Sequence, residues 1–171
     1  VSAFSIEGVD AENIGQALQV LAKKAGIYGM IGGQVVDVKC TGQSISGDTL
    51  DFIYRLKTGA LIESSMMIGA ILAGASKEEI KSVETIAQKV GLAFQIQDDI
   101  LDVTSTAEVL GKPIHSDEKN EKTTYVTWKG IEAAKAEVKQ LSEEAVKELK
   151  RLESTDEYLE LLLESLIYRK K

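Results

Sequence analysis

The residues with the clearest chemical potential are four polar side chains in one short segment. At 100° per residue, Gln95, Asp98, Asp99 and Asp102 fall within about a third of a helix circumference. Three carboxylates near the negative, C-terminal end of a helix repel one another, so a cation must compensate them. Lysines can do this, and so can Mg²⁺, which takes one or two carboxylates with water and phosphate oxygens. A solvated acidic helix end is the alternative, and the adjacent Phe94 counts against it.

A second cluster lies earlier in the chain, where Lys57, Thr58 and Gly59 follow one another. Glycine inside a helix costs about 1 kcal/mol relative to alanine and favours a kink, which frees backbone carbonyl groups. The kink would place an ammonium, a hydroxyl and carbonyl oxygens together, a set that suits a phosphate and a developing carbocation. Taken alone, an exposed lysine before a packing glycine explains the same residues.

A third cluster is the charged loop after the acidic helix, in which Lys112 and Lys122 bracket Asp117. If the loop folds back, the two lysines can complement a metal-bound diphosphate, whereas as isolated charges they are surface residues. His115 lies in the same loop, and no second His or Cys stands at metal-ligand spacing. We therefore interpret His115 as a loop residue rather than a ligand.

Helices are predicted to position these clusters, because apolar residues recur with a period near 3.6 and the chain holds a single proline. Ser76, followed three residues later by Glu79, forms a capping box that predicts the start of the acidic helix. Helices are predicted at about 10–25, 30–38, 48–73 with a kink at 58–59, 76–103, 131–152 and 157–169, with loops at 39–47 and 105–122. The sequence predicts an all-α fold.

Composition excludes several classes of protein. The net charge of -7 argues against a nucleic-acid-binding protein, since such surfaces need dense positive patches. The longest apolar run, 66–75, is shorter than the ~20 residues of a membrane-spanning helix, so we expect no transmembrane segment. The single cysteine, Cys40, fits a reducing cytoplasm, and we expect it to be a small buried apolar residue rather than a nucleophile. The chain starts at Val1 without a signal segment, so we expect a fragment or a processed product.

Read together, the clusters resemble the trans-polyprenyl diphosphate synthases of the farnesyl and geranylgeranyl class. An isolated acidic motif is weak, but five motifs in the family's order and spacing are specific, and they cover nearly the whole chain. The motifs are Gly32-Gly33-Gln34-Val35-Val36-Asp37, Lys57-Thr58-Gly59-Ala60-Leu61, Phe94-Gln95-Ile96-Gln97-Asp98-Asp99-Ile100-Leu101-Asp102, Gly111-Lys112 and the run from Ser116-Asp117 to Lys122-Thr123-Thr124-Tyr125. The basic tail 168–171 also resembles the terminus that closes over the site in this family.

The resemblance implies an isoprenoid synthase helical bundle, in which residues 1–171 are the C-terminal part of a single domain, and a homodimer. Such enzymes condense an allylic diphosphate (dimethylallyl or geranyl) with isopentenyl diphosphate, giving farnesyl or geranylgeranyl diphosphate, and Mg²⁺ ions assist ionisation of the allylic substrate. The first aspartate-rich motif and the basic residues for isopentenyl diphosphate belong before Val1 in this family. The isolated chain is therefore expected to lack prenyl-transfer activity.

Roles for the charged residues follow from the resemblance. Asp98 would ligate one Mg²⁺, with Asp99 and Asp102 supporting it directly or through water. Three lysines would neutralise the departing diphosphate, most strongly as negative charge develops on the leaving oxygen: Lys57, Lys112 and Lys122. These assignments make the loop and the kinked helix parts of one catalytic site.

Roles for the uncharged residues follow in the same way. Thr58 and Gln95 would place oxygen atoms beside the allylic cation, and Phe94 would line the isoprenoid pocket. Gln34 and Asp37 would form part of the wall or of its hydrogen-bonded support.

One departure from the family concerns the loop, where the family usually has a glycine in place of His115. Two rival interpretations remain open. A terpene cyclase or head-to-head synthase also ionises allylic diphosphates, although the Lys57 and Lys112 motifs favour the elongating class. A non-catalytic helical subunit that binds a catalytic partner is the other, although it has no need for the acidic helix.

Overall fold

The computed structural model describes residues 2–105, 122–152 and 157–168 of the chain. Throughout these ranges the regular structure is helical, and no strand occurs in them, so the predicted all-α fold is confirmed. The helices follow one another in this order: η1 (Ser2–Ser5), α1 (Ala11–Ala25), α2 (Met30–Cys40), α3 (Gly47–Ile53), η2 (Tyr54–Gly59), α4 (Ala60–Leu72), α5 (Lys77–Thr104), α8 (Tyr125–Lys129), α9 (Ile131–Leu149) and α10 (Glu157–Ile167).

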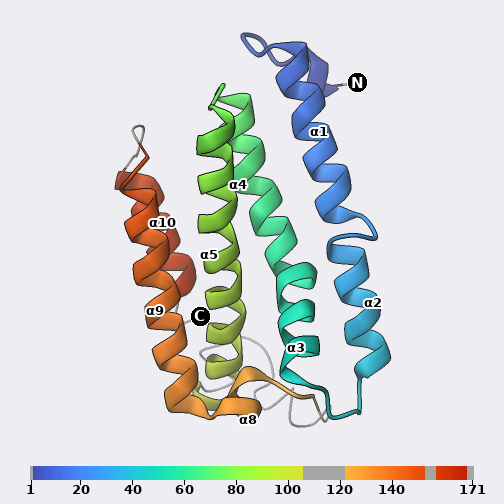
Figure 1. Ribbon diagram of the computed structural model, residues 1–171, viewed down its shortest axis with the longest axis vertical. Coiled ribbons are helices and arrows are strands. Elements are labelled where there is room, and N and C mark those ends of the chain that lie inside the picture. Colours follow the sequence, from blue (N-terminus) through green and yellow to red (C-terminus); the bar gives the residue numbers. More distant parts are fainter. Residues whose placement is uncertain (1, 106–121, 153–156, 169–171) are drawn as a thin grey trace.

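The helices lie side by side along the long axis of the molecule (Figure 1). α1 and α2 run down one side, α3, η2 and α4 return beside them, and α5 runs down the middle. α9 packs along α5, and α10 packs on both. The lower end in Figure 1 gathers the C-terminal ends of α2 and α5, together with α3 and α8.

α5 starts at the predicted capping box. The Ser76 hydroxyl accepts a hydrogen bond from the backbone N–H of Glu79 (3.2 Å), and the Glu79 carboxylate accepts one from the backbone N–H of Ser76 (2.7 Å). A cap of this kind stabilises a helix by about 1 kcal/mol. Farther along, α5 buries a continuous apolar stripe at helical spacing: Ile86, Ala87, Val90, Ala93, Ile96 and Ile100. The rigid stripe fixes the rotation of α5, and with it the direction of its acidic residues.

The kink predicted at residues 58–59 takes the form of a π-helical segment, η2, between α3 and α4. A π-helix widens the backbone turn by one residue and often marks a functional position. Upstream, the Ser46 hydroxyl caps α3 by accepting the backbone N–H of Thr49 (3.2 Å). The whole segment from α3 to α4 is therefore one helical rod with a distortion in its middle.

The predictions missed α8, and they placed the end of α9 at Leu152. α8 is a five-residue helix whose Thr124 hydroxyl accepts the backbone N–H of Thr127 (3.1 Å). α9 ends at Leu149 because the next turn closes on three-residue bonds, including the one from the Leu152 N–H to the Leu149 carbonyl (3.0 Å). Such differences of one turn do not alter the packing of α9 on α5.

Several large apolar side chains of α1, α2 and the turn between them remain exposed. They are Leu18, Leu21, Ile27, Tyr28, Ile31, Val35 and Val38.

Lys24, near the end of α1, forms ion pairs with Glu63 of α4 and with Glu84 of α5 (3.0 Å). No helix of the described ranges is long and apolar enough to cross a membrane.

Candidate active site

A pocket of about 320 Å³ opens at the end of the bundle where α2, η2 and α5 meet. Its wall combines charged, polar and apolar groups from all three segments and from the residues before α8. The lining residues are Asp37, Cys40, Thr41, Gln43, Ile45, Leu50, Ile53, Tyr54, Lys57, Thr58, Phe94, Gln95, Asp98, Asp99, Lys122, Thr123 and Thr124. The volume is within the range of pockets that hold small molecules.

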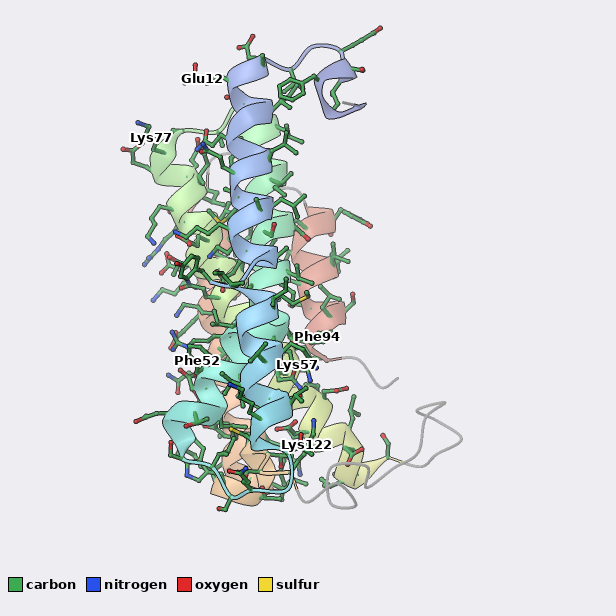
Figure 2. The ribbon with its side chains drawn as sticks, turned by 90° about the vertical axis from the view of Figure 1, so that its right-hand side faces the viewer. Glu12, Phe52, Lys57, Lys77, Phe94 and Lys122 are labelled. Carbon is green, nitrogen blue, oxygen red and sulfur yellow. The ribbon has the colours of Figure 1, made fainter. Side chains whose placement is uncertain are left out.

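Most of the predicted site residues gather at this pocket. The predicted residues among its lining are Lys57, Thr58, Phe94, Gln95, Asp98, Asp99 and Lys122. In Figure 2, Lys57, Phe94 and Lys122 lie in the half of the molecule opposite Glu12 and Lys77. Asp102 is buried, at 3% exposure, and is not among the lining residues. Lys112 lies outside the described residues.

Thr58 and Gln95 connect η2 to α5 across the pocket. The Thr58 hydroxyl donates a hydrogen bond to the side-chain carbonyl oxygen of Gln95 (2.8 Å). Both side chains are only partly buried, so the pair forms part of the pocket surface. Because the bond fixes two rotamers, it holds the oxygen atoms of both residues as oriented dipoles at the wall.

Asp37 links two lysines that come from different segments, Lys57 from η2 and Lys122 from the residues before α8. Its carboxylate accepts a hydrogen bond from Lys57 Nζ (2.6 Å), and Lys122 Nζ lies 3.3 Å from each of its oxygens. Burial raises the pKa of Asp37, but the hydrogen bond and positive charge of Lys57 and the charge of Lys122 outweigh burial and hold it below its ordinary 3.8. Two ammonium groups therefore converge on one anionic group at the pocket wall.

We expect that replacement of Asp37 by asparagine makes the free energy of unfolding depend less on pH under acidic conditions. Because the folded pKa of Asp37 lies below the unfolded value of 3.8, its stabilising contribution is complete above that pH. The contribution is lost as the pH falls through the folded pKa. Urea unfolding measured between about pH 6 and pH 3 should therefore show a smaller loss for Asp37→Asn than for the unsubstituted chain.

The matched control for this measurement is Asp10→Asn. Asp10 is exposed, precedes α1 and makes no side-chain cap hydrogen bond. Its variant should follow the unsubstituted chain at every pH. If acidification lowered the free energy of unfolding of Asp37→Asn as much as that of the unsubstituted chain, the result would contradict the assigned ion pairs.

Asp99 is held from two sides although it is almost fully buried, at 4% exposure. The Tyr54 hydroxyl donates to its Oδ2 atom, and the backbone N–H of Tyr125 donates to the same atom (2.8 Å). Hydrogen bonds to a buried carboxylate stabilise its charged form. The inward-facing carboxylate therefore joins η2, α5 and α8, and Asp99 and Asp102 do not form a solvated acidic face.

We expect Tyr54→Phe to lower the free energy of unfolding by about 1–3 kcal/mol, because a buried carboxylate loses a donor. Urea unfolding of the chain measures the change. Tyr28→Phe is the control, since Tyr28 is 78% exposed and its variant should differ by less than about 0.5 kcal/mol. Equal stability of the Tyr54 and Tyr28 variants would show that the hydroxyl contributes nothing at Asp99.

The carboxylates of the site fit a magnesium ion through Asp98 above all, because Asp98 is partly exposed and lines the pocket. The described residues contain no group of three or more His, Cys, Asp or Glu side chains that could hold a metal by themselves. Mg²⁺ does not need one, since it is commonly held by one or two carboxylates with substrate phosphates and water. The predicted set of Asp98, Asp99 and Asp102 stays a prediction.

Tyr54 and Tyr125 are site residues to which sequence reasoning gave no role. Tyr54 stands three residues before Lys57, one helical turn away, and that spacing is the signal by which it could have been found. Cys40, expected to be buried, is only partly so and lines the pocket, because α2 ends at its mouth. Asp37 lines the pocket, whereas Gln34 is exposed and does not line it.

The described residues form a helical bundle with a pocket that charged, polar and apolar side chains line at one end. The family model described as polyprenyl synthetase matches residues 5–162. The chain therefore belongs to the polyprenyl synthetase family, and the resemblance found in the motifs is confirmed.

The chain is similar to proteins from plants and bacteria. The chloroplastic geranylgeranyl pyrophosphate synthase of Capsicum annuum is 44% identical over 151 residues, which cover 88% of this chain and 41% of that protein. The farnesyl diphosphate synthase of Escherichia coli (strain K12) is 39% identical over 155 residues, covering 88% of this chain and 52% of that protein. The chain thus spans about half the length of these relatives.

The solved structures add a likeness of fold. A Helicobacter pylori geranyltransferase, crystallised with magnesium and isoprenyl diphosphate, matches with a TM-score of 0.78 at 31% identity. The match covers 95% of this chain and 54% of that one. The described helices therefore have the arrangement of an isoprenoid synthase bundle, as predicted.

Proposed function

We propose that the chain is the C-terminal part of a polyprenyl diphosphate synthase. In this proposal the whole protein condenses an allylic diphosphate with isopentenyl diphosphate, giving farnesyl or geranylgeranyl diphosphate. The observation that carries the proposal is the meeting of Lys57 and Thr58 with Gln95 and Asp98 at one pocket. Segments that lie far apart in the sequence supply these four residues.

Lysines of the site would receive the departing diphosphate. Lys57 and Lys122 both pair with the carboxylate of Asp37, and these ion pairs support a site for negative charge beside them. A diphosphate bound there would gain charge-assisted hydrogen bonds that strengthen as negative charge builds on the leaving oxygen. Lys112 is proposed to join them from the loop.

Carboxylates of α5 would hold Mg²⁺, with Asp98 as the ligand and Asp99 and Asp102 as its support. The bound ion would supply electrophilic assistance to the departure of the diphosphate. Tyr54 and the Tyr125 N–H would keep Asp99 in place during this step, since both donate to it.

Uncharged residues of the pocket would accommodate the organic part of the substrate. The oxygens of Thr58 and Gln95, fixed by their mutual hydrogen bond, would face the allylic cation as oriented dipoles. Phe94 would provide an apolar wall for the isoprenoid chain. We further propose a homodimer in a reducing, cytoplasmic setting for the whole protein.

The proposal is tested by comparing the isolated chain with the whole protein. Calorimetric titration of inorganic pyrophosphate into the isolated chain should show binding that depends on Mg²⁺. The chain contains the carboxylates of α5 together with Lys57 and Lys122. The isolated chain should form no longer prenyl diphosphate from allylic and isopentenyl diphosphates with Mg²⁺, whereas the whole protein should. Failure of pyrophosphate to bind would remove the diphosphate site.

Product analysis of the whole protein completes this test. With an allylic diphosphate as the single substrate, we expect no cyclic or head-to-head product. A product of either kind would assign the protein to a different class of isoprenoid synthase. A longer prenyl diphosphate made by the isolated chain would show that the missing half is not needed.

A further inference from the structure

Two glycines, one in α2 and one in α5, lie in close contact with the π-helical segment η2. A Cβ atom on Gly33 of α2 would lie 2.4 Å from the backbone nitrogen of Lys57 and 2.8 Å from the Cβ atom of Leu56. A Cβ atom on Gly91 of α5 would lie 2.9 Å from the Cα atom of Gly59. All three distances are shorter than any real Cβ contact, so neither position accepts a side chain without a shift of backbone.

Not every helical glycine of the described residues lies so close to a neighbouring backbone. Gly15 of α1 and Gly69 of α4 are also helical glycines, yet a Cβ atom at either would meet nothing within 4 Å. In a helix interior, glycine is less stable than alanine by about 0.5–1 kcal/mol. Gly33 and Gly91 carry this cost in helix stability, but they allow a contact between backbones that any residue type with a Cβ atom would prevent.

The contacts fall on the residues that place the polar groups of the pocket. Gly33 touches Lys57 itself, and Gly91 touches the residue directly after Thr58. An ordinary contact at Gly33 would require η2 and α2 to separate by roughly 1 Å. A displacement of that size would move the Lys57 ammonium relative to Asp37, which it contacts at 2.6 Å. A shift at Gly91 would act on the bond that joins Thr58 of η2 to Gln95 of α5.

We propose that Gly33 and Gly91 are positioning residues, which set the ammonium of Lys57 and the hydroxyl of Thr58 by letting two helix backbones touch η2. The inference rests on the proposed function, because it concerns how the diphosphate site is held. Neither glycine contacts the ligand. Both act through η2, and Gly33 acts chiefly through Lys57.

The test is a double-mutant cycle on binding of inorganic pyrophosphate with Mg²⁺ to the chain, measured by calorimetry. We expect Gly33→Ala to weaken binding by about tenfold or more and Gly91→Ala, whose contact is longer, by less. Gly69→Ala, the matched control in open space, should change the affinity less than about twofold. In a Lys57→Ala background, Gly33→Ala should have almost no further effect, because the group that it positions is absent.

A purely structural role predicts a different cycle. In that case Gly33→Ala would weaken binding by the same factor with Lys57 present or absent, and this result would overturn the proposal. Full binding by both Gly33→Ala and Gly91→Ala would overturn it as well. Urea unfolding of each variant separates loss of the fold from loss of position, and if Gly33→Ala does not fold, the cycle is measured with Gly91→Ala in a Thr58→Ala background.

A second measurement does not depend on ligand binding. Hydrogen exchange of the amides in η2 should be faster in Gly33→Ala and Gly91→Ala, while exchange in α9 should match that of the unsubstituted chain. Unchanged exchange in η2 would overturn the positioning role even if pyrophosphate binds. Absence of pyrophosphate binding by the unsubstituted chain, with faster exchange in the variants, would instead overturn the proposed function and leave the role of the glycines in shaping η2.

Discussion

Replacement of Asp98 by alanine in the whole protein is expected to lower kcat by at least about 100-fold. Asp98 is the carboxylate of α5 that is partly exposed and lines the pocket with Lys57. Removing it takes away the proposed magnesium ligand that shares the pocket wall with Lys57 and Lys122. Steady-state assays with allylic and isopentenyl diphosphates at saturating Mg²⁺ measure the change.

Asp10→Ala is the control, because Asp10 is exposed at the start of α1 and lies far along the chain from the pocket residues. Its kcat should stay within about twofold of the unsubstituted protein. Asp98→Asn should lose nearly as much activity as Asp98→Ala, since a neutral amide is a poor ligand for Mg²⁺. Unchanged turnover in Asp98→Ala would remove Asp98 from the metal site.

Replacement of Lys57 by alanine should produce the second large loss, about 100-fold in kcat. The ammonium of Lys57 is expected to stabilise charge that develops on the leaving diphosphate, so its removal should act on the chemical step. The KM for the allylic diphosphate should also rise, but by a smaller factor, since Lys122 remains at the site. Kinetic assays of the whole protein give both parameters.

Two variants show whether this loss is specific. Lys77→Ala removes an exposed lysine at the opposite end of the molecule and should leave kcat within about twofold (Figure 2). Lys57→Arg keeps the charge and should recover part of the activity, although its planar guanidinium fits the position of an ammonium poorly. If Lys57→Ala raised KM and left kcat intact, the lysine would bind substrate without stabilising the departing group.

Most of the fold could be predicted because it rests on local signals. The apolar period and the capping box at Ser76 located α5 to within a residue at either end. α8 was missed because its five residues are too few to form a periodic stripe and include two β-branched and two aromatic side chains. Its formation depends on the Thr124 cap and on the bond from Tyr125 to Asp99, which only the folded chain provides.

The candidate site was predictable in its membership and less so in its geometry. A helical wheel places Asp98, Asp99 and Asp102 on one face, but it does not show which neighbours cover that face. In the structure Asp98 and Asp99 both line the pocket, but Asp99 is almost fully buried, and Asp102 is buried and does not line it. Similarly, the glycine of the Lys57 motif indicated a kink, but its π-helical form depends on packing against two other helices.

The bonds to Asp99 also bear on the order of folding events. Tyr54 is separated from Asp99 by 45 residues and Tyr125 by 26, so these bonds close larger loops than any contact within a helix. We expect these long-range contacts to form late in folding, because the entropy of closing their loops must be lost before they contribute energy. Tyr54→Phe should therefore speed unfolding and leave the refolding limb of a chevron plot almost unchanged. The bonds to Asp99 would then mainly lower the rate of unfolding and have little effect on the rate of folding. The resistance of the protein to slow inactivation would therefore depend on this carboxylate.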